Sequence, residues 1–112
     1  MFDLMRKYLR LEAEMRERKR RELLARTISA LNKLSSRVKF RGAYIFGSIT
    51  KPYMFFDSSD VDIAFLGLEE DKLFFTVAFL SEEIGRDVDV IELEKASFKD
   101  KILREGIRWR PS

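Results

Sequence analysis

Apolar residues recur along the first third of the chain at the three- and four-residue intervals of an α-helix. This spacing predicts one helix over residues 1–36. Two apolar stripes support it, the first made of Leu4, Tyr8, Leu11 and Met15 and the second of Leu24, Ile28, Leu31 and Leu34.

Three later segments have the composition and alternation of β-strands. They are residues 38–46 (VKFRGAYIF), 60–66 (DVDIAFL) and 87–93 (DVDVIEL). Gly47 and Ser48 form a turn signal after the first strand, and the segment that follows contains Pro52, which predicts a loop. Alternation places Asp60 and Asp62 on the same face of the second strand.

Two shorter helices complete the predicted elements. Residues 69–83 begin with acidic residues and carry apolar residues at helical spacing, with Gly85 where a C-terminal cap belongs. Ser97 and Asp100 resemble a capping box that opens a last helix, and Gly106 should end it. The order of elements predicts an α+β fold with α/β layering, in which a small sheet has helices packed mainly on one face. We also expect the tail to pack down through Trp109.

Two segments carry side chains that this core pattern does not use. Residues 16–22 (RERKRRE) lack an apolar face, but Glu precedes Arg by four residues repeatedly, which favours an ordered helix with a solvated surface. Binding of RNA or of an acidic partner is the alternative for this basic run. Residues 53–56 (YMFF) form either a lid or docking tip, or a loop that packs back on the core.

Composition narrows the chemistry that the chain can perform. It has no cysteine and no histidine, which excludes disulfides, thiolate or imidazole metal ligands, and His-dependent catalysis. Any metal must therefore be held by carboxylates, which favour hard cations such as Mg²⁺ or Mn²⁺. The absence of a membrane-spanning run and of a signal peptide predicts a cytoplasmic protein. Abundant Lys, Arg and Glu, no Gln and a single Asn32 indicate a thermophilic source.

The aspartates form the main candidate site. Residues two apart on a strand have Cα atoms about 6.6 Å apart and parallel side chains, so Asp60 and Asp62 can converge on one or two cations. Asp87 and Asp89 on the third strand are candidates for a third carboxylate, and alternation does not separate them. Gly47 allows a close backbone approach to an anion, and the neighbouring serine offers a hydroxyl and an N–H to a phosphate. These residues predict a magnesium–nucleotide site.

Several of these motifs together resemble a known family. They are Gly47-Ser48, the SDVDI segment from Ser59 to Ile63, the VDV segment around Asp89, and ILREGI near the C-terminus. In this combination the chain is similar to the minimal nucleotidyltransferases (MNT domain) of the DNA polymerase β-like superfamily, over roughly residues 22–109. The resemblance implies a nucleotidyltransferase fold at residues 22–112, with residues 1–21 as a helical extension of a single domain. The site residues that it implies are Asp60, Asp62 and Asp89 as catalytic metal ligands, and Gly47, Ser48, Lys51 and Ser59 as nucleotide contacts.

The resemblance also implies a function. Such domains use two Mg²⁺ ions, with Mn²⁺ as a substitute, to transfer a nucleoside monophosphate from ATP to a hydroxyl acceptor. Many minimal members are antitoxins that modify or bind a HEPN-domain ribonuclease, so we expect a HEPN-domain partner. A homo-oligomer is a further possibility, while membranes and nucleic acid are not the expected partners.

The segment after the Gly-Ser pair departs from the family pattern. Members usually carry a basic residue and then a glycine soon after this pair, whereas here Lys51 and Pro52 follow in a spacer one residue longer. Lys51 can supply the phosphate-facing charge, but Pro52 removes a backbone donor. The alternative function is therefore a catalytically weak or inactive nucleotide-binding module that neutralises a partner by protein–protein contact.

Overall fold

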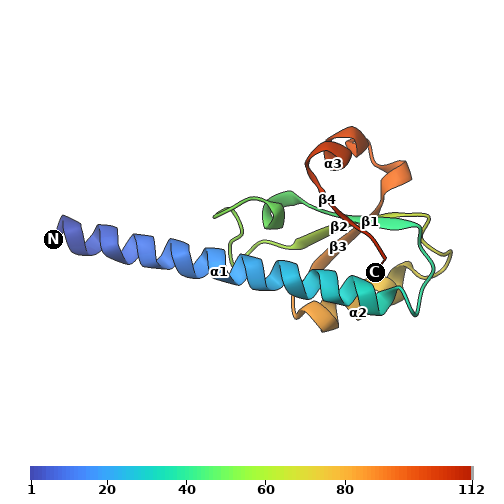
Figure 1. Cartoon of the computed structure of the whole chain (residues 1–112), viewed down its shortest axis with the longest axis horizontal. Coiled ribbons are helices and arrows are strands. Elements are labelled where there is room, and N and C mark those ends of the chain that lie inside the picture. The colour runs from blue at the N-terminus through green and yellow to red at the C-terminus, as the bar shows by residue number, and fades with distance from the viewer. Residues whose placement is uncertain (112) are drawn as a thin grey trace.

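The computed structural model describes residues 1–111 and contains one four-stranded sheet between helices (Figure 1). Its elements in chain order, with η marking 3₁₀-helices, are α1 (Phe2–Leu34), β1 (Gly42–Phe46), η1 (Gly47–Thr50), β2 (Val61–Leu66), α2 (Leu73–Ile84), β3 (Val88–Glu92), η2 (Leu93–Lys95), α3 (Lys99–Glu105) and β4 (Ile107–Trp109). The strand order is β3-β2-β1-β4, with β2 and β3 parallel and the other two pairs antiparallel. The predicted α+β fold with a small mixed sheet is confirmed.

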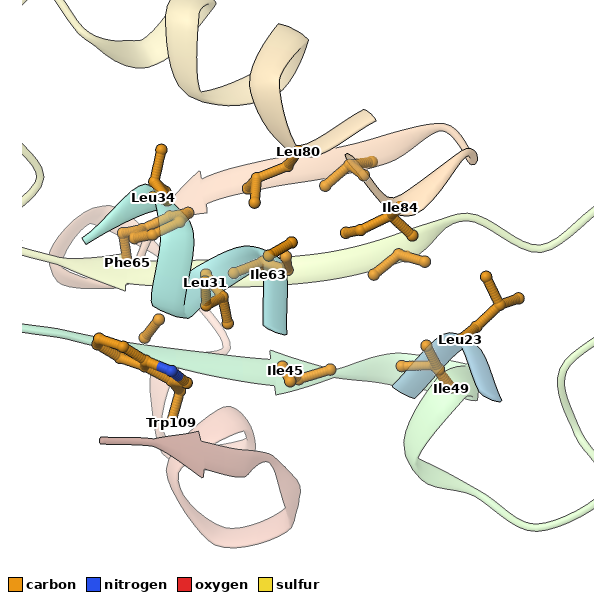
Figure 2. Packing of buried hydrophobic residues seen from close by; sticks show 14 of the residues in the cluster. Leu23, Leu31, Leu34, Ile45, Ile49, Ile63, Phe65, Leu80, Ile84 and Trp109 are labelled. Carbon is orange, nitrogen blue, oxygen red and sulfur yellow. The ribbon is translucent and has the colours of Figure 1, made fainter. Parts of the chain in front are cut away.

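The main hydrophobic core lies between the sheet and the two longer helices, α1 and α2 (Figure 2). Alternate residues of the central strands, such as Ile45 and Ile63, point to this side and are fully buried. They pack in the same cluster as Leu31 of α1 and Leu80 of α2. Burial of an aliphatic side chain of this size stabilises a fold by about 1.5–3 kcal/mol, so this layer supplies most of the hydrophobic stabilisation.

The opposite face of the sheet is covered only in part. Tyr44 and Ala64 on this face form a smaller buried cluster with Leu93 of η2 and Ile102 of α3. The short helix α3 therefore lies on the other side of the sheet from α1 and α2, as Figure 1 shows. The remaining part of this face stays accessible, which is where a polar site can form.

Helix α1 is longer than the body of the domain that it covers. Its 33 residues give the molecule a long axis of 57 Å, against 28 and 24 Å in the other two directions. The first buried side chain of α1 is that of Glu17, and the helix before it projects away from the sheet (Figure 1). We call residues 1–15 the N-terminal arm. Although α1 is long, no helix within residues 1–111 has the run of apolar residues that crossing a membrane requires.

Some predicted element boundaries are wrong. The second helix was expected from residue 69, but α2 begins at Leu73, because Asp71 has a positive φ of 64° that does not continue a helix. The expected capping box is absent, since α3 begins at Lys99 after Phe98 and has no side-chain cap. The first strand is shorter than predicted, because β1 starts at Gly42 rather than at residue 38.

The C-terminal residues form a strand that the sequence analysis did not predict. Strand β4 pairs antiparallel with β1, which places Trp109 opposite Ala43. The indole of Trp109 is 4% exposed, and its Nε1 donates a hydrogen bond to Oδ1 of Asn32 at 2.9 Å. The expectation that Trp109 anchors the chain end is confirmed, and the sheet gains an edge strand from the same segment.

Candidate functional site

The aspartates lie on the face of the sheet that α1 and α2 leave uncovered. Asp62 of β2 shares this face with Ala64 and is opposite Asp89 in the parallel β2–β3 pair. Because neighbouring strands are about 4.8 Å apart, the two carboxylates emerge side by side. Asp60 directly precedes β2 and is exposed. The structure therefore brings the three predicted aspartates to one end of this face.

The structure separates the two candidates on the third strand. Asp89 is within β3 and in register with Asp62. Asp87 precedes the strand, and its carbonyl accepts a hydrogen bond from the N–H of Val61 at 3.0 Å. Asp89 is consequently the residue of β3 whose carboxylate faces that of β2.

Asp62 is electrostatically unusual. Burial, and after it the negative charges of Asp89 and Asp60, raise the pKa of the Asp62 carboxyl from 3.8 to about 6. Closely spaced carboxylates without a basic partner fit a hard divalent cation, because the cation cancels the repulsion that raises the pKa. Within residues 1–111 no three Asp or Glu side chains are already gathered into a metal-binding cluster. Asp62 and Asp89 are therefore the pair that fits the cation, with Asp60 beside them.

Gly47 is required at its position by Asp62. It has a φ of 80°, a left-handed conformation that glycine adopts without strain. A side-chain Cβ at residue 47 would overlap with Oδ2 of Asp62, so the backbone of the turn lies directly against this carboxylate. The predicted Gly-Ser pair and the predicted Asp pair thus meet in space, although a loop separates them in the sequence.

A cavity of about 240 Å³ opens beside Gly47, between η1 and α3. Lys51 and Lys101 line it, together with the neighbouring aromatic rings of Phe46 and Phe98, whose centroids are 6.0 Å apart. One acidic residue, Glu105, lines the cavity as well, so the two lysines leave it with a net positive charge, which suits an anion such as a phosphate. Lys51, which was predicted as a nucleotide contact, is one of the residues that line this cavity.

Lys101 is a candidate that the sequence analysis missed. It belongs to no motif, and only the packing of α3 over the end of β1 brings it to the cavity. The spacing of residues along the chain contains no signal for that packing. The sequence shows only that Lys101 is a basic residue directly before the ILREGI segment.

The two predicted serines have different surroundings. Ser48 lies in η1 and is half-buried, and its carbonyl accepts the N–H of Lys51 at 3.1 Å. The hydroxyl of Ser59 accepts the N–H of Phe56 at 3.0 Å, which closes the turn before Asp60. Ser59 is not among the residues that line the cavity. The structure thus shows Ser59 positioning the chain that leads into the aspartates.

A buried ion pair on α1 holds the spacer that follows the Gly-Ser turn. Arg20 donates Nε and Nη2 to the two carboxylate oxygens of Glu17, each at 2.7 Å, and donates Nη1 to the carbonyl of Ile49 at 2.8 Å. Glu17 also accepts the backbone N–H of Tyr53 at 2.7 Å. The side chains of Glu17 and Arg20 are 5% and 9% exposed. We call this arrangement the spacer clamp, because it fixes both ends of the segment from Ile49 to Tyr53.

The prediction of a fully solvated surface for residues 16–22 is therefore wrong for Glu17 and Arg20. Of the Glu–Arg spacings of four residues, only Glu17–Arg21 closes to an ion pair within residues 1–111, at 3.4 Å. The ion pair of the spacer clamp joins residues three apart, Glu17 and Arg20. Their other hydrogen bonds go to backbone groups of the loop that follows β1. A second arginine, Arg86, holds the far end of the same loop by donating Nη2 to the carbonyls of Phe56 and Asp57 at 2.6 and 2.7 Å.

Comparisons with known proteins give one family match and two similar solved structures. Residues 26–108 match the family model described as "Polymerase beta, Nucleotidyltransferase". A solved structure provisionally described as a minimal nucleotidyltransferase aligns with a TM-score of 0.60 and 25% identity, over 79% of this chain and 93% of that one. A second one, from Sulfolobus solfataricus and provisionally described as a nucleotidyltransferase, aligns with a TM-score of 0.48 and 20% identity, over 81% and 82%. No curated protein sequence matches the chain significantly.

The raised pKa of Asp62 predicts that its ionisation costs stability in metal-free protein. The folded state binds the proton more tightly than the unfolded state, so the free energy of unfolding falls as pH rises from about 4 to about 6. Asp62→Asn removes this cost. After allowance for solvent screening, the variant should be more stable than the wild type by about 1 kcal/mol at pH 8 in EDTA, and equal to it at pH 4. Urea unfolding at both pH values measures this, and equal stabilities at pH 8 would contradict it.

The spacer clamp predicts the opposite pH dependence. Hydrogen bonds from Arg20 and from the Tyr53 backbone lower the pKa of Glu17 from 4.5 to about 2. Its contribution is therefore present above pH 4.5 and is lost as the pH falls towards 2. Glu17→Gln should lower the melting temperature by several degrees at pH 7, and the difference should shrink in acid. Glu82→Gln, on the exposed surface of α2, is the control that should change little; a similar loss in both variants would argue against the clamp.

Proposed function

The chain belongs to the polymerase β nucleotidyltransferase family, and on that premise we propose that it transfers a nucleoside monophosphate from ATP to a hydroxyl acceptor. The observation that carries the proposal is the position of Asp62, which faces Asp89 across β2 and β3 and lies against the backbone of Gly47. Carboxylates and an anion-accepting turn at one place are what binding of a metal–triphosphate requires.

The residues divide into two groups by their role in binding. Asp62 and Asp89, with Asp60 beside them, would hold the Mg²⁺ ions. When bound, these ions neutralise the charge of the triphosphate. The turn at Gly47-Ser48 offers backbone N–H groups to phosphate oxygens. Lys51 and Lys101 would bind the phosphates that leave as pyrophosphate, because both line the cavity beside this turn.

The transfer step needs one proton acceptor. As the acceptor oxygen bonds to the α-phosphorus, the bond from this phosphorus to the bridging oxygen breaks and pyrophosphate leaves. The hydroxyl proton goes to the carboxylate of Asp89, which is exposed on β3 and therefore accessible to an incoming hydroxyl. The acceptor that we propose, following the family resemblance, is a HEPN-domain protein.

A second candidate function is neutralisation of that same partner by contact, with little or no catalysis. It is favoured by the loop between η1 and β2, where the side chains of Tyr53, Met54 and Phe56 are 46–53% exposed. The spacer clamp and Arg86 hold this loop, so it offers an ordered apolar surface next to α1. Rigid exposed aromatic residues are common anchors in protein interfaces.

Incubation with α-labelled ATP, Mg²⁺ and a lysate of the source organism tests the first function. We expect label on an acceptor, and a loss of more than about 100-fold in Asp62→Asn, because the carboxylate that holds the cation is gone. Asp87→Asn is the matched control and should keep full activity, since Asp87 precedes β3. Full activity in Asp62→Asn would refute the assignment. If the wild type transfers nothing but still inhibits its partner, the second function is supported.

The cavity lysines predict a separate effect on nucleotide affinity. Lys101→Ala should weaken binding of a non-hydrolysable ATP analogue about tenfold, because it removes a charge-assisted contact to phosphate. The matched control is Lys99→Ala on the same helix, because Lys99 does not line the cavity. Isothermal titration calorimetry measures both, and equal affinities for the two variants would show that Lys101 does not contact the nucleotide.

A further inference from the structure

The N-terminal arm presents an apolar stripe that nothing in the domain covers. The stripe is the series Met1, Leu4, Tyr8, Leu11 and Met15, with side chains 93%, 74%, 61%, 51% and 67% exposed. Their intervals of three, four, three and four residues are those of positions a and d in a heptad repeat. None of the side chains of residues 1–15 is among the buried residues of α1, so the stripe is available to a partner.

A bare arm of this kind is unfavourable in water. Isolated helices shorter than about 12–15 residues are marginal, so the arm gains little from its own backbone hydrogen bonds. Contiguous exposed apolar surface is also rare on monomeric proteins and usually marks an interaction site. The first buried side chain of α1 is that of Glu17, so the domain does not bury the stripe. Association is the remaining way to cover it.

We propose that the arm pairs with the arm of a second copy of this chain in a short two-stranded coiled coil. With Met1 and Tyr8 at position a, Lys7 and Glu14 fall at position g and Glu12 at position e. In a parallel pair Lys7 faces Glu12 of the second copy. In an antiparallel pair, the four residues Leu4, Tyr8, Leu11 and Met15 pack against the same residues of the second copy in reverse order. Lys7 then faces Glu14 instead. Both orientations thus place opposite charges across the stripe.

The charges of the arm also distinguish this occupant from nucleic acid. The basic side chains of residues 1–15 are Arg6, Lys7 and Arg10, and the acidic ones are Asp3, Glu12 and Glu14. The arm therefore carries no net side-chain charge, so it lacks the excess of positive charge by which proteins bind phosphate backbones. Because the apolar and charged positions of the arm complement one another, the partner that fits the arm best is the arm of a second copy.

The base of the arm adjoins a mostly charged groove of the domain. This groove, of about 390 Å³, is lined by the apolar residues Met15 and Phe56 and by charged residues of both signs, among them Arg16. The guanidinium of Arg16 lies 4.5 Å from the centroid of the Phe56 ring, and Phe56 remains 46% exposed. The apolar seam available to a second copy is therefore that of the arm itself.

Sedimentation equilibrium of the full-length chain over a range of concentrations tests this proposal. The wild type should be dimeric, and Leu11→Glu should weaken the dimer by about 100-fold or more, because it places a charge at a core position of the interface. Leu9→Glu is the matched control: Leu9 is 55% exposed on the same arm but lies off the stripe, and the dimer should persist. Circular dichroism checks that both variants remain folded. The proposal would be overturned if the wild type is monomeric, even if it binds another protein. It would also be overturned if both substitutions weaken the dimer equally.

Charge reversal tests the pairing independently of the apolar stripe. Lys7→Glu should weaken the dimer by placing like charges across the seam. Adding Glu12→Lys and Glu14→Lys to that variant should restore the dimer, because the opposite charges then face one another again. A triple variant that stays as weak as Lys7→Glu alone would refute the assigned pairing.

Discussion

The repulsion between neighbouring carboxylates on β2 and β3 is the constraint that organises this molecule. No ion pair formed within residues 1–111 includes Asp62 or Asp89, so their charges are not balanced by the chain itself. Uncompensated, partly buried charge lowers stability, and proteins retain it mainly at functional sites. The fold tolerates the repulsion because the face opposite to the aspartates carries the main core. A bound cation would remove the repulsion between the carboxylates, and this gain would contribute to the affinity of the site for the cation.

Two residues within the basic part of α1, Glu17 and Arg20, contact the spacer beside this site, while Lys19 and Arg21 lie on the surface. Arg20 and Glu17 are satisfied by one another and by the backbone of the spacer, so a segment that contains Pro52 and departs from the family pattern is held in one conformation. Truncating one partner of such a buried pair leaves the other charge uncompensated, which is more costly than the net value of the pair. The clamp also explains how α1, the longest element, can order the loop between Gly47 and Asp60.

Local patterns in the sequence predicted much of the fold. Alternation identified the strands and placed Asp60 and Asp62 on one face, and the family motifs identified Asp89 and Gly47. What could not be predicted depends on pairings between distant segments. The edge strand β4 needs β1 as a partner, the clamp joins α1 to a loop 29 to 36 residues away, and Lys101 reaches the cavity only through the packing of α3. No periodicity within a single segment reveals such contacts.

The proposed metal–nucleotide site depends on Asp62, whose partly buried carboxyl lies near two other aspartates. The most direct test is a titration of the Asp62 side-chain carboxyl by ¹³C NMR, without metal and with saturating Mg²⁺. We expect a pKa of about 6 for Asp62 in EDTA and a clear fall in that pKa when Mg²⁺ is added. An ordinary aspartate pKa in EDTA, or a raised pKa that Mg²⁺ does not lower, would contradict it.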